Sequence, residues 1–163
     1  MKSWTLKAAT LAGSAMLAAT AATAATASAQ AAPAPSSSTV QIEKTPGDVT
    51  RTGDGWCHFT HWGGSFYCLG RANDVVIWQK PDGYPQVFVL GTNRAVYSRW
   101  STASGVSSWY DGLRGSCKPD RGFDSTASGW SITIACVGDD GGWWHNTRST
   151  SGSWSDWKRG KGF

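Results

Sequence analysis

The sequence predicts an all-β protein built from antiparallel strands. From about residue 55 onward, short apolar stretches rich in Val, Ile, Tyr and Trp are separated by Gly, Asp and Asn. No stretch keeps the 3.6-residue period of an amphipathic helix over three turns. Twenty Gly and eleven Trp among 163 residues fit short strands joined by tight turns. This length allows one domain and excludes a large multidomain enzyme.

The first 29 residues have the pattern of a secretory signal peptide. Lys2 and Lys7 precede a run rich in Ala, Thr and Leu that ends in the triplet Ala27-Ser28-Ala29, an Ala-x-Ala cleavage site. The alternative, a membrane anchor, needs roughly 20 strongly apolar residues, whereas Thr and Ser interrupt this run. We therefore expect an exported protein with residues 1–29 removed, a flexible Pro/Ser-rich leader over 30–50, and a folded domain over 51–163.

Nine strands are expected in the folded part, each of ordinary length. The connections between them contain Gly with Asn or Asp, which favour tight turns and antiparallel neighbours. The expected strands are 57–61, 65–69, 75–79, 85–90, 95–100, 107–110, 130–137, 143–148 and 154–158.

All four cysteines lie in the exported part, where an oxidising environment favours two disulfides over free thiols or zinc. Four cysteines allow three connectivities, of which we prefer Cys57–Cys68 with Cys117–Cys136. The first pair falls across an expected hairpin with the loop His61-Trp62-Gly63-Gly64. Each bridge should stabilise the fold by about 2–4 kcal/mol.

Three segments superpose around a glycine turn: 66–78, 88–99 and 134–146. In each, a strand ends at a Gly, a polar turn follows, and the next strand begins with bulky apolar residues. The second and third copies continue alike, because 104–109 matches 151–157 with one inserted residue. Gly91 and Gly138 are 47 residues apart, which is within the range of four-stranded propeller blades. The first copy begins only about 21 residues before the second, so we interpret it as a truncated unit.

The stretch Gly91-Thr92-Asn93-Arg94-Ala95-Val96-Tyr97, followed by a Trp-containing strand and a Gly with Ser-x-Trp, resembles the repeat of PLL-type bacterial β-propeller lectins and, more distantly, tectonin repeats. Trp62-Gly63 resembles the opening of such a repeat. The resemblance covers roughly residues 60–160 and implies a partial β-propeller of about two repeats that binds carbohydrate without catalysis. Two blades cannot cover their own faces, so it also implies a homo-oligomer that completes a ring, or a small sandwich.

Ten of the eleven Trp lie in the exported part, and a fold this small cannot bury ten indoles fully. Some must fill the core. A Trp stacked beside polar side chains would match the apolar face and the hydroxyls of a sugar. This reasoning and the resemblance together give the candidate carbohydrate-binding residues Asn93, Tyr97, Arg99, Trp100, Trp109, Asp139, Trp144, His145, Asn146, Trp154 and Trp157.

Charge argues against some partners. The exported part has 13 Lys and Arg against 11 Asp and Glu, a net charge of +2 without a basic block. We therefore expect no nucleic acid as a partner and no membrane insertion. The alternative function is a secreted protein-binding module, such as an inhibitor or competition factor, that uses exposed Trp, Tyr and Arg as hot spots.

Catalytic chemistry is a weaker interpretation, and no catalytic residue, metal site or cofactor is expected. The single Glu43 lies in the expected leader, so a two-carboxylate hydrolase would depend on a turn pair such as Asp139 and Asp140. His58 and His61 are three residues apart, so on one strand they face opposite sides and cannot share a metal. A thiol nucleophile at Cys57 conflicts with oxidising export.

Overall fold

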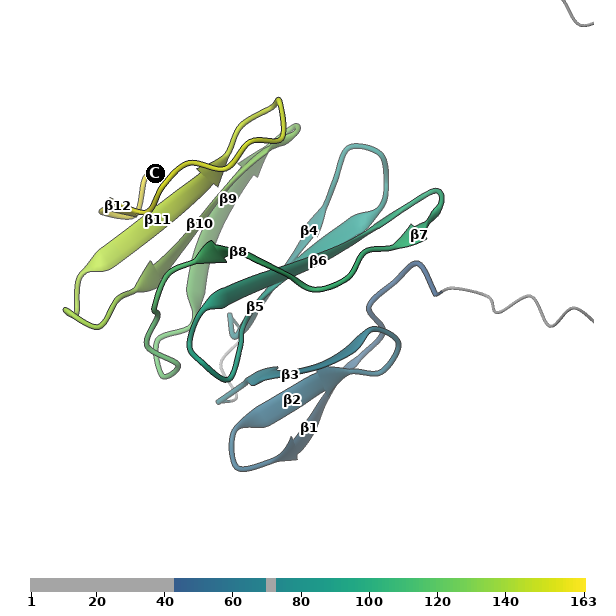
Figure 1. Ribbon diagram of the computed structural model, residues 1–163, viewed down its shortest axis with the longest axis horizontal. Helices are drawn as coiled ribbons and strands as arrows, with labels where there is room; N and C mark the ends of the chain where they lie inside the picture. The colour runs from purple at the N-terminus through teal and green to yellow at the C-terminus, as the bar shows by residue number, and fades with distance from the viewer. Residues whose placement is uncertain (1–42, 70–72) are drawn as a thin grey trace, which may run out of the picture. The chain divides into compact units, whose positions relative to one another are not determined.

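The computed structural model describes residues 43–69 and 73–163. The expected signal peptide and most of the expected leader lie outside the described residues. Within these ranges the chain forms antiparallel strands and no helix, which confirms the predicted all-β class (Figure 1). No helix in this part of the chain is long and apolar enough to span a membrane.

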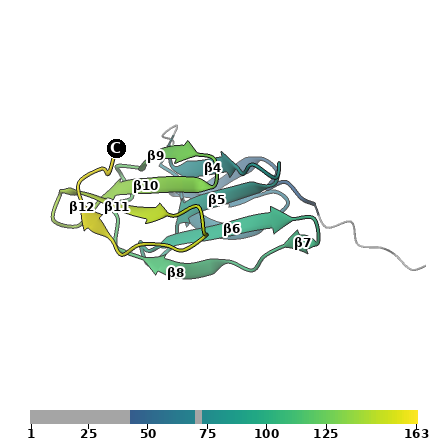
Figure 2. The ribbon, with the colours of Figure 1, turned by 90° about the horizontal axis from the view of Figure 1, so that it is seen from above.

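The strands form three sheets that follow one another in chain order (Figures 1 and 2). Sheet one contains β1 (Val49–Gly53), β2 (Trp56–Phe59) and β3 (Gly63–Tyr67). Sheet two contains β4 (Val75–Gln79), β5 (Pro85–Leu90), β6 (Val96–Thr102), β7 (Gly105–Val106) and β8 (Tyr110–Arg114). Sheet three contains β9 (Phe123–Ser128), β10 (Ser131–Val137), β11 (Trp143–Arg148) and β12 (Lys158–Arg159).

Sheet one differs from its expectation at both ends. β1 was not expected as a strand, because all five of its residues are exposed and its apolar pattern is correspondingly weak. The β2–β3 hairpin is confirmed, but Phe59 pairs with Gly63, so the loop spans 60–62 and not 61–64. Residues 43–48, within the expected leader, contact this sheet: the Trp62 indole donates to the Glu43 carbonyl at 2.9 Å, and the Thr60 amide to the Asp48 carbonyl at 2.9 Å.

The second and third predicted repeat copies form the same hairpin, β5–β6 and β10–β11. In the first, the Gly91 amide donates to the Ala95 carbonyl at 3.0 Å. In the second, the Gly138 amide donates to the Gly142 carbonyl at 2.8 Å. The remaining segment, 66–78, does not form such a hairpin, because β3 and β4 belong to different sheets. The expected superposition of that segment is wrong.

The two repeats also match after the hairpin, where each has the same contact between a Ser hydroxyl and a backbone amide. The Ser107 hydroxyl accepts the Trp100 amide at 3.1 Å, and the Ser155 hydroxyl accepts the Thr147 amide at 3.1 Å. A last strand then pairs back, β8 on β6 and β12 on β11. Sheets two and three are therefore two propeller-like repeats, with the strand orders β4-β5-β6-β8 and β9-β10-β11-β12, in a propeller that is not closed.

Two apolar clusters hold the sheets together, and β5 contributes to both. Val87 and Val89 pack with the sheet-one residues Phe59 and Phe66, while Phe88 packs with sheet three. This division follows from the alternation of side chains along a strand. Each such side chain, when fully buried, stabilises the fold by about 1.5–3 kcal/mol.

Both preferred disulfides are confirmed, and they connect different parts of the fold. Cys57–Cys68 closes the β2–β3 hairpin of sheet one. Cys117–Cys136 joins the segment after β8 to β10, so it links the end of one repeat to the next. Two disulfides are consistent with an oxidising or extracellular location.

Candidate functional site

Two hollows in the surface occupy matching positions in the repeat. The first, here called the tyrosine pocket, measures about 210 Å³. The second, the tryptophan pocket, measures about 320 Å³. The tyrosine pocket is lined by Gly64, Ser65, Phe66, Val89, Gly91, Thr92, Tyr97 and Trp109. The tryptophan pocket is lined by Gly115, Ser116, Cys136, Gly138, Asp139, Asp140, Trp144 and Trp157.

Each pocket lies between a Gly-Ser segment and the glycine turn of the next sheet. In the tyrosine pocket, an isolated antiparallel bridge joins Phe66 to Gly91. In the tryptophan pocket, the equivalent bridge joins Cys117 to Gly138. The two segments read Gly64-Ser65-Phe66 and Gly115-Ser116-Cys117. The pockets are therefore two copies of one site, placed by the repeat.

A Trp ring lies against the Gly of each segment. A Cβ added at Gly64 would lie 2.6 Å from Cζ2 of Trp109, and a Cβ added at Gly115 would lie 2.8 Å from Cε2 of Trp157. Both glycines have positive φ, +86° and +79°, so a side chain there would also strain the backbone. The indole of Trp157 is further held by its N–H, which donates to the Leu113 carbonyl at 2.7 Å. Each pocket thus has an aromatic wall, and the Trp ring can occupy this position because the glycine beside it has no side chain.

The polar groups of the two pockets differ. At the tyrosine pocket, the Asn93 amide donates to the Tyr97 hydroxyl at 3.2 Å. At the tryptophan pocket, the Trp144 indole N–H donates to Oδ1 of Asp140 at 3.1 Å. The Gly142 amide donates to the same oxygen at 3.0 Å. The tryptophan pocket is therefore the more acidic copy.

Both carboxylates of the tryptophan pocket are held by neighbouring donors. Hydrogen bonds from the Gly142 amide and from Trp144, with the charge of Arg159, lower the pKa of Asp140 against a smaller opposing effect of desolvation. Asp139 binds Arg94 at 2.7 Å and accepts the Ser116 hydroxyl at 2.8 Å. A general acid of a hydrolase needs a raised pKa, so Asp140 suits hydrogen-bond acceptance better than proton donation.

Five of the candidate residues line these two pockets. Asn93 lies beside the tyrosine pocket, where it is hydrogen-bonded to Tyr97. Trp100 and Trp154 line a different hollow. The candidates that line the two repeat-related pockets are Tyr97, Trp109, Asp139, Trp144 and Trp157.

The remaining candidates have contacts within the fold. Asn146 is buried, and its Oδ1 accepts the Ser155 hydroxyl at 3.0 Å. Arg99 donates to the carbonyls of Ser107 and Trp62, and burial lowers its pKa. His145 Nδ1 lies 3.0 Å from the Gly160 carbonyl oxygen.

Sequence reasoning missed the Gly-Ser segments, although they are visible as a repeated dipeptide before Phe66 and Cys117. Asp140 was weighed only as a catalytic residue, and the structure places it in the wall of the tryptophan pocket. Across residues 43–69 and 73–163, no group of three His, Cys, Asp or Glu side chains could hold a metal ion. Comparison of the chain with protein-family models gives no match, and comparison with curated proteins gives none either.

Proposed function

We propose that the protein is a secreted, non-catalytic carbohydrate-binding protein in which the tyrosine and tryptophan pockets each hold one sugar residue. The observation that carries this proposal is the repetition of a Trp ring, backed by glycine, at the same place in both repeats. Ligand sites in proteins generally measure about 300–1,000 Å³. Hollows of about 210 and 320 Å³ are small enough to suit a single sugar ring.

The side chains supply both parts of sugar recognition. An aromatic face stacks on the C–H face of a sugar, and short polar groups bind its hydroxyls. The tryptophan pocket offers two indoles with Asp139, Asp140 and Ser116. The tyrosine pocket offers Tyr97 and Trp109 with Thr92 and Ser65. Because the polar sets differ, we expect the two pockets to prefer different sugars.

Two sites on one chain also support multivalent binding. Linked sites raise the strength of attachment to a surface that displays many sugars, without any new contact. A homo-oligomer that completes the ring would add further copies. We propose this assembly together with the lectin function, since the propeller of one chain is open.

A glycan-array screen of the oxidised protein tests the proposal, followed by titration of the best hit with intrinsic Trp fluorescence. Trp144→Ala and Trp143→Ala form a matched pair, because the two residues are adjacent, both half-buried, and point to opposite faces of β11. Trp144→Ala should weaken binding at its pocket by about tenfold or more, since losing an aromatic contact of about 1.4 kcal/mol has that effect. Trp143→Ala should leave that pocket's affinity unchanged.

Two results would remove the proposal. A folded, disulfide-intact sample that binds no glycan would direct attention to a protein partner. Equal losses of affinity in Trp144→Ala and Trp143→Ala would show that the bound sugar lies elsewhere.

A further inference from the structure

A third hollow, of about 400 Å³, belongs to neither copy of the repeated site. It lies between sheet two and the end of sheet three that carries the β9–β10 turn and the loop after β11. Its lining combines four aromatic side chains with two cations and contains no carboxylate. We call it the arginine pocket; it is lined by Lys80, Gln86, Trp100, Thr102, Tyr110, Trp130, Arg148, Gly152 and Trp154.

The charge of Lys80 is already compensated. Its Nζ lies 3.0 Å from Oδ2 of Asp82 and donates to the Ser101 carbonyl at 3.0 Å, and the side chain is only 7% exposed. Desolvation opposes ionisation of Asp82, but hydrogen bonds from Lys80 and from the Tyr84 amide, with the charge of Lys80, lower the pKa of Asp82 overall. Lys80 and Asp82 therefore form an ion pair with no net charge at one wall of the pocket.

Arg148 has no such compensation. Its Nη1 donates to the Trp130 carbonyl at 2.7 Å, and its guanidinium lies 5.7 Å from the Trp78 ring centre. None of the ion pairs within residues 43–69 and 73–163 includes Arg148. A guanidinium has five N–H donors in a planar fork that matches a carboxylate. The pocket therefore carries one unmatched positive charge with donors to spare.

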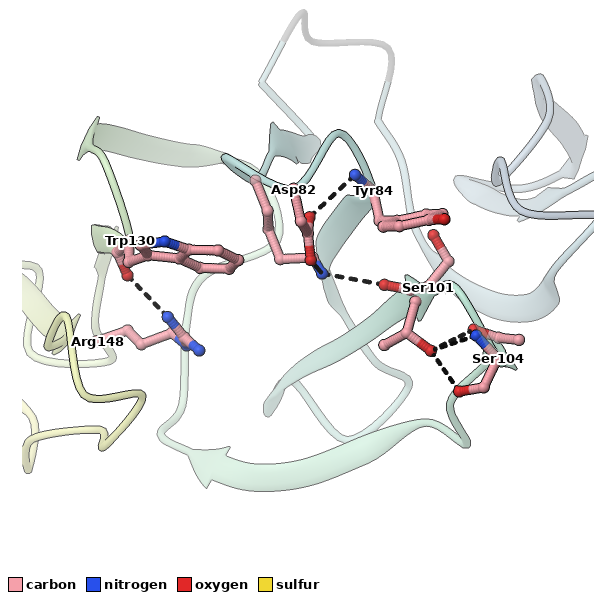
Figure 3. Close-up of polar contacts among 9 residues, drawn as sticks. Asp82, Tyr84, Ser101, Ser104, Trp130 and Arg148 are labelled. Atoms are coloured by element: carbon pink, nitrogen blue, oxygen red, sulfur yellow. Dashed lines mark hydrogen bonds and ion pairs between the residues drawn. The ribbon is translucent and has the colours of Figure 1, made fainter.

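An exposed aromatic ring lies beside this charge. Figure 3 shows Trp130 and Arg148 extending from the same side toward Asp82 and Ser101. Trp130 is 39% exposed, which is unusual for so large an apolar side chain. Trp154, in contrast, makes a T-shaped contact with Phe88 and packs, partly buried, against the core. One cation already lies near this ring, because Nζ of Lys80 is 6.0 Å from its centre. The exposed part of Trp130 is thus the surface on which a ring could stack while a carboxylate reaches Arg148.

We propose that the arginine pocket binds an acidic sugar residue, a hexuronate, with its ring on Trp130 and its carboxylate on Arg148. This site is separate from the two repeat-related pockets and does not depend on their function. A charged and bidentate contact contributes more than a neutral hydrogen bond. The pocket should therefore discriminate a uronate from the neutral sugar of the same shape.

The test compares methyl β-glucuronide with methyl β-glucoside in calorimetric titrations of the oxidised protein. We expect the glucuronide to bind at least about tenfold more tightly, and its affinity to fall as salt is raised because the contact is ionic. Sodium acetate is the third probe. Competition by acetate as strong as that of the glucuronide would mean a simple anion site and would overturn the assignment to a sugar.

Arg148→Gln should weaken glucuronide binding by about tenfold or more, and Arg121→Gln is its control. Both changes remove one positive charge, but Arg121 is exposed, pairs with Asp120 and lies outside the pocket. Trp130→Ala is a second variant that removes an exposed ring, so it keeps the test valid if Arg148→Gln folds poorly. We expect it to weaken the glucuronide by a similar factor.

Trp144→Ala separates this inference from the proposed function. It should leave glucuronide binding unchanged, even if it abolishes binding of another sugar. If glucuronide binding is lost in Trp144→Ala and kept in both Arg148→Gln and Trp130→Ala, the acidic sugar occupies the tryptophan pocket and the inference is wrong.

Discussion

Replacing Gly115 by Ala should cost more stability than replacing Gly83 by Ala, although both glycines have the same φ. Each has φ of +79°, in the left-handed region that L side chains rarely adopt. A non-glycine residue there costs about 1–2 kcal/mol. A Cβ at Gly83 would have nothing within 4 Å, so that variant should lose only this backbone term.

Gly115→Ala must also move the indole of Trp157. The new Cβ would lie 2.8 Å from Cε2 and 2.9 Å from Nε1, which is closer than real Cβ contacts allow. Displacing the ring breaks its 2.7 Å hydrogen bond to Leu113, worth about 0.5–1.5 kcal/mol, and loosens its packing. We expect a total loss of about 2–4 kcal/mol for Gly115→Ala, against about 1–2 kcal/mol for Gly83→Ala.

Urea unfolding of the oxidised variants, followed by far-UV circular dichroism, measures both free energies. Trp fluorescence of the folded state should change in Gly115→Ala and stay as in the wild type in Gly83→Ala. Equal losses of unfolding free energy in the two variants would refute the reasoning, because they would show that Trp157 does not rest on Gly115.

Three further changes test other parts of the structure. Replacing Cys57 and Cys68 by Ala should lower the free energy of unfolding by about 3 kcal/mol, because the disulfide no longer restricts a loop with a sequence separation of 11 in the unfolded chain. Urea unfolding that matches the wild type would contradict this. Because the pKa of Asp140 is lowered from 3.8, its contribution to holding Trp144 is present above pH 3.8 and is lost as the pH falls through the folded-state pKa. Trp fluorescence should therefore change below pH 3.8 by more in the wild type than in Asp140→Asn, and equal changes would count against the contact. Arg94→Gln removes an exposed ion pair with a carboxylate at 2.7 Å, so thermal unfolding should show a loss below about 1 kcal/mol.

The sequence allowed prediction of those features that depend on local turn chemistry. Gly91 and Gly138 mark the equivalent hairpins because both end a strand before a polar turn. The strands 75–79, 85–90 and 143–148 have the expected bounds, since they are rich in β-branched and aromatic residues and follow clear turn signals. β9 was missed because most of it is exposed and polar, so no apolar alternation reveals it.

Features that depend on contacts between sheets could not be predicted in the same way. The wall of each pocket comes from the chain segment before it, Gly64 or Gly115, and only the fold brings that segment against the next glycine turn. The burial of individual tryptophans is also a tertiary property. Trp62 and Trp78 are buried, whereas Trp130 is exposed, and nothing in their neighbours along the chain distinguishes them.

The two joints between successive sheets are made of different chemistry. Beside the tryptophan pocket, the joint is the covalent Cys117–Cys136 bond, whereas at the equivalent place beside the tyrosine pocket Phe66 and Val89 meet in an apolar cluster. An apolar contact separates and re-forms readily, but a disulfide does so only by exchange with a thiol. The contact beside the tyrosine pocket can therefore re-form without redox chemistry, whereas the link beside the tryptophan pocket is covalent once its disulfide has formed.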